Sequence, residues 1–178
     1  MRFLSGLLAA GLLTGLTLAA DGKFTLTGAN TKVEFTGTKA EGKHDGGFKK
    51  LTGTVTVTGT DPATARIEVT IDTTSLYTDT AKLTGHLKSS DFFDVKSNPT
   101  AKFVSAKVEK DGGKYKVTGE LTLNGKKKAI SFPATIATTG KALKLDSEFK
   151  IDRTDFGMTY GKGKIHDAVT IRVKVDAK

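Results

Sequence analysis

The stretch Ile71–Phe103, IDTTSLYTDTAKLTGHLKSSDFFDVKSNPTAKF, decides the fold of this chain of 178 residues. It begins as the end of one alternating strand and ends as the start of another, and the connection between them is far longer than a hairpin loop. Long connections in compact domains usually carry structure or function of their own. Bulky apolar side chains in this one predict that it covers something apolar. They are Leu83, Leu87, Phe92 and Phe93, and the polar His86 and Asp91 lie among them.

Helical signals are confined to this connection. Asp79 or Thr80 can cap a short helix that runs to Leu87, and Ser89 or Ser90 can cap a further turn. Leu83 and Leu87, four residues apart, would share one face of that helix.

Outside the connection, apolar residues recur with a period of two. This alternation indicates strands with one buried face and one solvated face. Turn signals divide the runs into about eight strands with hairpin-like spacing. Two alternating runs are regular enough to predict which side chains point inward: Ile67, Val69, Ile71, Val169, Ile171 and Val173.

One hairpin is predicted with particular clarity. Asn124-Gly125 can adopt the positive φ angles of a tight type I′ turn, between the arms Glu120–Leu123 and Ala129–Phe132. Pro133 cannot donate a ladder hydrogen bond, so it marks a bulge or an edge position.

The prediction for residues 21–178 is therefore one all-β domain of eight antiparallel strands with a long, partly helical connection. Eight strands can form a sandwich or a closed barrel, and the pattern alone leaves this open. An eight-stranded barrel is wide enough either to be filled by side chains or to hold one small ligand.

Residues 1–20 have the order of a secretory signal peptide. Arg2 supplies a positive charge, Phe3–Leu18 is apolar, and small residues lead to Ala20. An uncleaved anchor is the alternative, although the apolar run is shorter than the roughly 20 residues of a membrane span. Export predicts a periplasmic or secreted protein. The chain has no cysteine, so we expect no disulfide and no lipoprotein anchor.

Without Arg2 the chain has 27 basic and 19 acidic residues. A basic surface can meet nucleic acid, anionic lipid headgroups or acidic polymers. The lysines alternate with apolar residues along strands, which favours a solvated outer face. The export signal, the three tyrosines and the absence of tryptophan count against nucleic acid. A transient contact with a membrane surface stays open.

The three histidines, His44, His86 and His166, each have an acidic neighbour but no metal-ligand spacing. The chain also lacks a nucleophile elbow and a phosphate-binding loop. We therefore expect no metal, no cofactor and no catalytic residue. A small metal-dependent or hydrolytic envelope protein that uses the three histidines is the alternative. His44 lies in Gly42–Gly47, predicted as a glycine-flanked turn that can approach a ligand or another backbone closely, with a simple hairpin loop as the alternative.

Arg153 lies between Asp152 and Asp155 in a second polar cluster, after the strand that ends at Ile151. Such a cluster favours a local network of ion pairs in a turn. The functional alternative makes Arg153 a residue at the barrel mouth that meets a ligand headgroup or pairs with Asp91.

Three stretches together resemble the YceI-like family: Ile71–Phe103, GELTLNGKKKAISF at Gly119–Phe132 and IDRTDFGMTYG at Ile151–Gly161. The resemblance implies a lipocalin-like barrel, a periplasmic location and non-catalytic binding, storage or transport of an amphiphilic isoprenoid-type lipid or quinone-like molecule. Residues Ser75–Val95 would form a lid. A side-chain-filled barrel that offers only a binding surface is the other possibility. The expected ligand-binding residues are Phe35, His44, Leu83, His86, Leu87, Phe92, Phe93, Arg153 and Phe156.

Overall fold

The computed structural model describes residues 21–139 and 141–178, so the predicted signal peptide at residues 1–20 lies outside the described residues. Within the described ranges the chain forms eleven strands, one α-helix and three 3₁₀ turns. The strands are β1 Gly22–Thr27, β2 Thr31–Lys39, β3 Gly42–Phe48, β4 Leu51–Val57, β5 Arg66–Asp72, β6 Leu76–Thr78, β7 Thr100–Asp111, β8 Lys114–Leu123, β9 Lys126–Thr138, β10 Leu143–Asp152 and β11 Ala168–Ala177. The helix is α1 Ala81–Lys88, and the turns are η1 Pro62–Thr64, η2 Thr73–Ser75 and η3 Arg153–Phe156.

These eleven segments correspond to eight strands of the barrel. Three of the eight are interrupted, and each of these three is therefore counted as two segments. β1 leads into β2 through residues 28–30, β3 into β4 through residues 49–50, and β5 into β6 through η2. The two halves of each interrupted strand keep the same neighbour: β2 pairs with β3 while β1 pairs with β4, and β3 pairs with β6 while β4 pairs with β5. The eight strands that the sequence predicts are therefore present, three of them with a short interruption.

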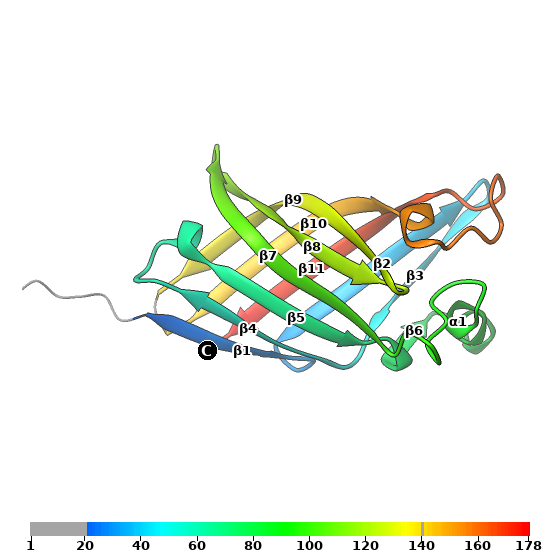
Figure 1. The fold of residues 1–178 in the computed structure, drawn as a ribbon, viewed down its shortest axis with the longest axis horizontal. Helices are drawn as coiled ribbons and strands as arrows, with labels where there is room; N and C mark the ends of the chain where they lie inside the picture. Colours follow the sequence, from blue (N-terminus) through cyan, green and yellow to red (C-terminus); the bar gives the residue numbers. More distant parts are fainter. Residues whose placement is uncertain (1–20, 140) are drawn as a thin grey trace, which may run out of the picture.

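The sheet closes on itself because β11 pairs with β2, from Thr170↔Thr36 to Val175↔Thr31. All pairs are antiparallel, so the predicted lipocalin-like barrel is confirmed (Figure 1). The long connection lies at one end of the barrel, whereas the C-terminus and the start of β1 lie at the other (Figure 1). We call these the α1 end and the terminal end.

Local signals behave as expected at two places. Thr80 caps α1, since its hydroxyl accepts a hydrogen bond from the Leu83 amide at 3.2 Å. Asn124 and Gly125 have φ angles of 49° and 70°, as the tight hairpin between β8 and β9 requires.

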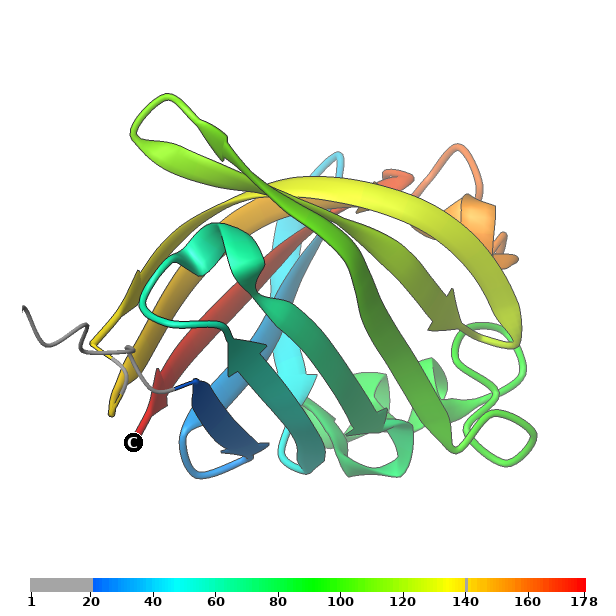
Figure 2. The same ribbon diagram turned by 60° about the vertical axis from the view of Figure 1, so that its left-hand side comes forward.

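Closure is incomplete between β9 and β10. Their ladder has four pairs, from Leu143↔Thr138 to Asp146↔Thr135, whereas β10 and β11 share ten. Figures 1 and 2 show the two strands side by side near the C-terminus and diverging toward the α1 end. Pro133, which cannot donate a ladder bond, lies where the ladder stops. We call the separated part the β9–β10 split.

The barrel interior changes from filled to hollow along its length. On β10, Leu143 and Leu145 are buried, whereas Phe149 and Ile151 are only half-buried although they lie on the same face. The inward side chains of β11 show the same change. All six side chains predicted to point inward line the hollow part, which confirms that prediction: Ile67, Val69, Ile71, Val169, Ile171 and Val173.

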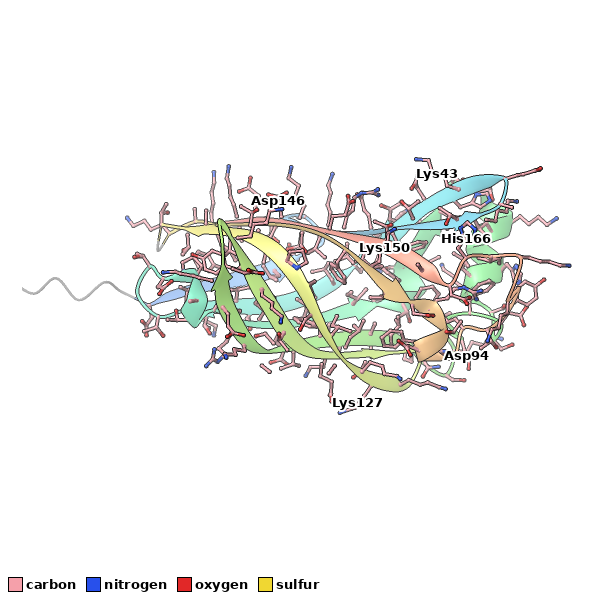
Figure 3. The ribbon with its side chains drawn as sticks, turned by 90° about the horizontal axis from the view of Figure 1, so that it is seen from above. Lys43, Asp94, Lys127, Asp146, Lys150 and His166 are labelled. Carbon is pink, nitrogen blue, oxygen red and sulfur yellow. The ribbon has the colours of Figure 1, made fainter. Side chains whose placement is uncertain are left out.

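The outer face is charged and hydroxyl-rich, and Lys43 and Lys127 point away from the barrel (Figure 3). This fits the solvated face that the alternation predicts. In the part of the chain that the structure describes, no helix has the length and apolar character to cross a bilayer.

The contrast between the filled and hollow parts predicts different effects for the same substitution. Val117→Ala should lower the free energy of unfolding by about 2 kcal/mol, because Val117 is 0% exposed and its truncation leaves a void. Val173→Ala should cost less than about 1 kcal/mol, since its side chain already borders open space. Urea denaturation measures both variants, and equal losses would contradict a hollow α1 half.

Candidate functional site

The hollow half contains a cavity of about 370 Å³ with walls that are apolar almost throughout. Phe132 and Phe149 stack inside it, with ring centroids 4.4 Å apart and an interplanar angle of 10°. Phe103 packs against Phe132 at 5.4 Å. Small-molecule sites are typically of this size and lined mainly by apolar and aromatic side chains.

The long connection covers the α1 end of this cavity. Leu83 and Leu87 reach it from α1, and Phe92 and Phe93 reach it from the following loop. The Phe93 ring lies 5.7 Å from Phe48. The four apolar side chains that the sequence singled out therefore border the α1 end of the cavity, and we call the segment that carries them the lid.

The two adjacent phenylalanines of the lid have different roles. Phe92 is 6% exposed and belongs to a second small core with Leu123, Phe156 and Met158. Phe93 is half-buried, packs against the same core, and its ring also meets Phe35 and Phe48 of the cavity wall. Phe92 thus anchors the lid, while Phe93 presents its ring to the interior.

Two of the three histidines connect neighbouring segments at the α1 end of the cavity, which we call the mouth. His44 Nδ1 lies 2.8 Å from Asp79 Oδ2, which ties β3 to the start of the lid. His166 Nδ1 lies 2.8 Å from the Thr38 hydroxyl, which ties the loop after η3 to β2. The mouth is therefore held together by side-chain contacts between segments distant in sequence.

His86 has a different position, outside the cavity lining, where its ring packs against Phe92. Its Nε2 lies 2.9 Å from Asp91 Oδ2, and its ring meets Tyr160 edge-on at 4.7 Å. No group of three or more potential metal ligands gathers anywhere in residues 21–139 and 141–178. The alternative that joins the three histidines in one metal site gains no support from their contacts.

The expectation of a turn at Gly42–Gly47 is wrong, because these residues form most of strand β3. A Cβ atom on Gly46 would lie 2.5 Å from the Phe35 ring and 2.6 Å from the Tyr77 carbonyl oxygen. Glycine is therefore required by the close approach of the Phe35 ring and of β6, and not by a turn.

Polar side chains of the cavity gather on the hairpin of β2 and β3. Thr38, Lys39 and His44 line the mouth there. Gly37, directly opposite His44 in the ladder, leaves open space, since a Cβ atom at this position would have no neighbour within 4 Å. A polar mouth above an apolar interior suits a molecule with one polar and one apolar end.

Arg153 is committed to the protein itself. It is 4% exposed, and its five N–H groups are directed at the carbonyl oxygens of four residues and at the Asp167 carboxylate, 2.9 Å away. The four carbonyls belong to Met158, Tyr160, Ile165 and His166. Arg153 thus holds the loop after η3 in place, as the local-network interpretation predicts, and Asp91 pairs with His86 instead.

The turn that positions Arg153 is capped by Asp152. The Asp152 carboxylate accepts hydrogen bonds from the hydroxyl and amide of Thr154, at 2.6 and 2.8 Å. These bonds, the hydroxyl bond above all, lower the pKa of Asp152 below its ordinary value, because they favour the ionised form. Asp72 and Thr74 repeat the arrangement in η2, and the pKa of Asp72 is lowered for the same reason.

The structure brings seven of the nine predicted ligand-binding residues to the cavity: Phe35, His44, Leu83, Leu87, Phe92, Phe93 and Arg153. His86 and Phe156 are outside the cavity lining; Phe156 is 1% exposed inside the second small core. The prediction omitted other lining side chains, among them Lys39, Phe48, Phe103, Phe132 and Phe149. For Phe103, Phe132 and Phe149 a signal was available, because each occupies an inward position of an alternating strand. Phe48 had no such signal, because it follows the stretch predicted as a turn.

Comparison with known proteins gives a consistent result. The model of the YceI-like domain matches residues 24–177. The chain belongs to the YceI-like family. The protein YceI of Escherichia coli O157:H7 is 35% identical over 137 residues, which cover 74% of this chain and 72% of that protein.

Solved structures agree with the family assignment. BcnA of Burkholderia cenocepacia has a TM-score of 0.77 and 30% identity, covering 85% of this chain and 98% of that one. A polyisoprenoid binding domain from Saccharophagus degradans has a TM-score of 0.68 over 91% of this chain and 99% of that one. At 15% identity, that second likeness shows the YceI-like fold alone.

Arg153→Lys should lower the free energy of unfolding by about 3–5 kcal/mol, because a lysine cannot reach five acceptors and leaves buried groups unpaired. Hydrogen exchange of the amides in residues 158–167 should accelerate at the same time. The matched control is Arg172→Lys, which alters an exposed pair with Glu148 and should cost less than about 1 kcal/mol. Equal small losses in the two variants would show that Arg153 does not hold the loop.

Proposed function

We propose that this YceI-like protein binds, stores or transports an amphiphilic isoprenoid-type lipid, quinones included, inside its barrel, without catalysing a reaction. The observation that carries the proposal is the hollow apolar half of the barrel under its lid. Inward aromatic side chains such as Phe103 and Phe149 remain half-exposed there. Removing such surface from water is favourable by about 25 cal/mol per Å² of apolar area. A bound apolar chain gains this free energy both for its own surface and for the surface of the cavity wall that it covers.

The distribution of polarity supports an amphiphile over a pure hydrocarbon. The interior offers few polar partners, whereas the hairpin of β2 and β3 presents Lys39 and His44 at the mouth. A lipid bound with its chain inward would bring its polar end to these groups. Because such lipids reside in membranes, the proposal includes a transient contact with a membrane surface during loading.

The Saccharophagus degradans domain also supports this ligand class, since it shares the fold and is itself a polyisoprenoid binding domain. The direct test is mass spectrometry of an organic extract of the protein, purified under native conditions from a bacterial cell envelope. Stoichiometric recovery of an isoprenoid lipid would support the proposal. Stoichiometric zinc in a protein free of lipid would favour the metal-dependent alternative instead.

We further propose a periplasmic or secreted location, on the basis of the leader-like residues 1–20. Cleavage should occur near Ala20, where small residues precede Asp21. N-terminal sequencing of protein from the cell envelope should therefore begin near Asp21. A mature chain that starts at Met1 would overturn the secretory interpretation.

The lid predicts a separation between binding and stability at neighbouring positions. Phe93→Ala should weaken binding of a short-chain isoprenoid quinone at least about tenfold, because its ring faces the cavity. Phe92→Ala should mainly lower stability, by about 3–5 kcal/mol, because its ring is buried in the second small core. Quinone affinity and the unfolding midpoint are measured in both variants and in the double variant. Unchanged affinity in all three would make the two rings plugs of the barrel end and remove the lid.

A further inference from the structure

The segment between η3 and β11 lies beside the mouth and presents an exposed aromatic ring. We call residues 157–166 the mouth loop, and Figure 1 shows this part of the chain at the α1 end, near the hairpin of β2 and β3. Tyr160 of this loop is 48% exposed. Val104 on β7, at 40%, is the other exposed large hydrophobic side chain among the described residues. Tyrosine combines an apolar body with a polar end, and it is enriched at the headgroup level of membranes.

The mouth loop is held in place between the hairpin and the lid. Ile165 forms a β-bridge with Lys39 of β2, and the Tyr160 ring meets the ring of His86 in the lid at 4.7 Å. Arg153 fixes the backbone of the loop, in part through the Tyr160 carbonyl oxygen at 2.8 Å. A preformed loop of this kind loses little conformational entropy when it docks on a surface.

The mouth loop has positive charge and no acidic residue of its own. Lys162 and Lys164 are exposed, and the loop contains neither aspartate nor glutamate. Lys39, bridged to the loop, also lines the mouth. In the part of the chain that the structure describes, none of these three lysines takes part in an ion pair. Their charges are therefore available to an external anion.

Acidic residues next to the mouth loop reduce this charge only in part. Asp91 lies 2.9 Å from His86, and Asp167 lies 2.9 Å from Arg153, so both are engaged with a basic side chain. Glu41 at the tip of the hairpin is exposed and would oppose an anionic surface. Together with the three lysines it leaves the equivalent of about two positive charges, each contributing about fivefold in affinity near anionic lipid.

We propose that the mouth loop docks the protein on a bilayer that contains anionic lipids, with the Tyr160 ring at the headgroup level and Lys162 and Lys164 against lipid phosphates. The proposal rests on the proposed function, because a lipid carrier has to meet the membrane that holds its lipid. Docking through this loop places the mouth of the cavity against the bilayer. It also brings to the membrane a ring that contacts the lid.

Co-sedimentation with vesicles tests the role of charge. Vesicles of phosphatidylcholine alone are compared with vesicles in which about a third of the lipid is phosphatidylglycerol. The protein should bind the anionic vesicles at least about tenfold more tightly. This preference should disappear in about 1 M salt, where the Debye length is about 3 Å.

Paired substitutions test whether the mouth loop carries the charge that matters. Lys162→Gln with Lys164→Gln should weaken binding to anionic vesicles at least about tenfold. Lys23→Gln with Lys144→Gln is the matched control, because it removes the same charge from exposed positions at the terminal end. The control should weaken binding less than about threefold.

A single tryptophan tests the placement of the ring, because the chain contains none of its own. The emission of Tyr160→Trp should shift to the blue when anionic vesicles are added, and brominated lipid should quench it. Val104→Trp is the control, since Val104 is exposed on β7 in the barrel wall, and its emission should stay unchanged.

Each outcome has a defined meaning. Equal binding to both kinds of vesicle, equal losses in the two lysine pairs, or unchanged emission of Tyr160→Trp overturns docking through the mouth loop. Affinity for a short-chain isoprenoid quinone, measured without vesicles, separates this result from the proposed function. Lys162→Gln with Lys164→Gln should leave that affinity unchanged, because neither lysine lines the cavity. Quinone binding without vesicle binding overturns the docking alone, whereas vesicle binding without quinone binding overturns the proposed function alone.

Discussion

The pairing of β11 with β2 is the constraint on which the rest of the structure depends. Six residue pairs join the last strand to the first and turn an alternating sheet into a cylinder. Closure fixes the radius, and the inward side chains then decide what the interior becomes. Toward the terminal end they fill it. Toward the α1 end the same alternation supplies side chains that line a space without filling it, and the cavity follows from that difference.

Side-chain contacts hold the mouth together, whereas backbone ladders hold the walls together. Side chains hold its segments together, through His44 with Asp79, His166 with Thr38, and Arg153 with the loop after η3. The two histidine contacts join parts of the chain that are distant in sequence, and Arg153 fixes the loop that follows its own turn. The walls depend on backbone ladders that tolerate substitution on their outer face, whereas the mouth depends on a few specific side chains.

Local sequence patterns predicted the secondary-structure elements well. They failed where the local structure depends on contact with another segment of the chain. Alternation identified the inward faces of β5 and β11, and the capping signal at Thr80 located α1, because these properties reside in a few neighbouring residues. Gly42–Gly47 was predicted as a glycine-flanked turn, yet Gly46 accommodates the Phe35 ring and the Tyr77 carbonyl oxygen of β6. The partners of Arg153 and the divergence of β9 from β10 depend on register and on backbone carbonyls, which composition does not encode.

The β9–β10 split leaves two strand edges without a ladder partner, and such edges are templates on which copies of a β protein add strands and aggregate. The chain protects this place with charge. Lys126, Lys127 and Lys128 begin β9 beside the split, Lys128 pairs with Asp155 of η3, and Pro133 removes a donor near its far end. The basic run that begins β9 thus lies beside the strand edges where self-association would start. We therefore expect replacement of these lysines by apolar residues to promote aggregation through this edge.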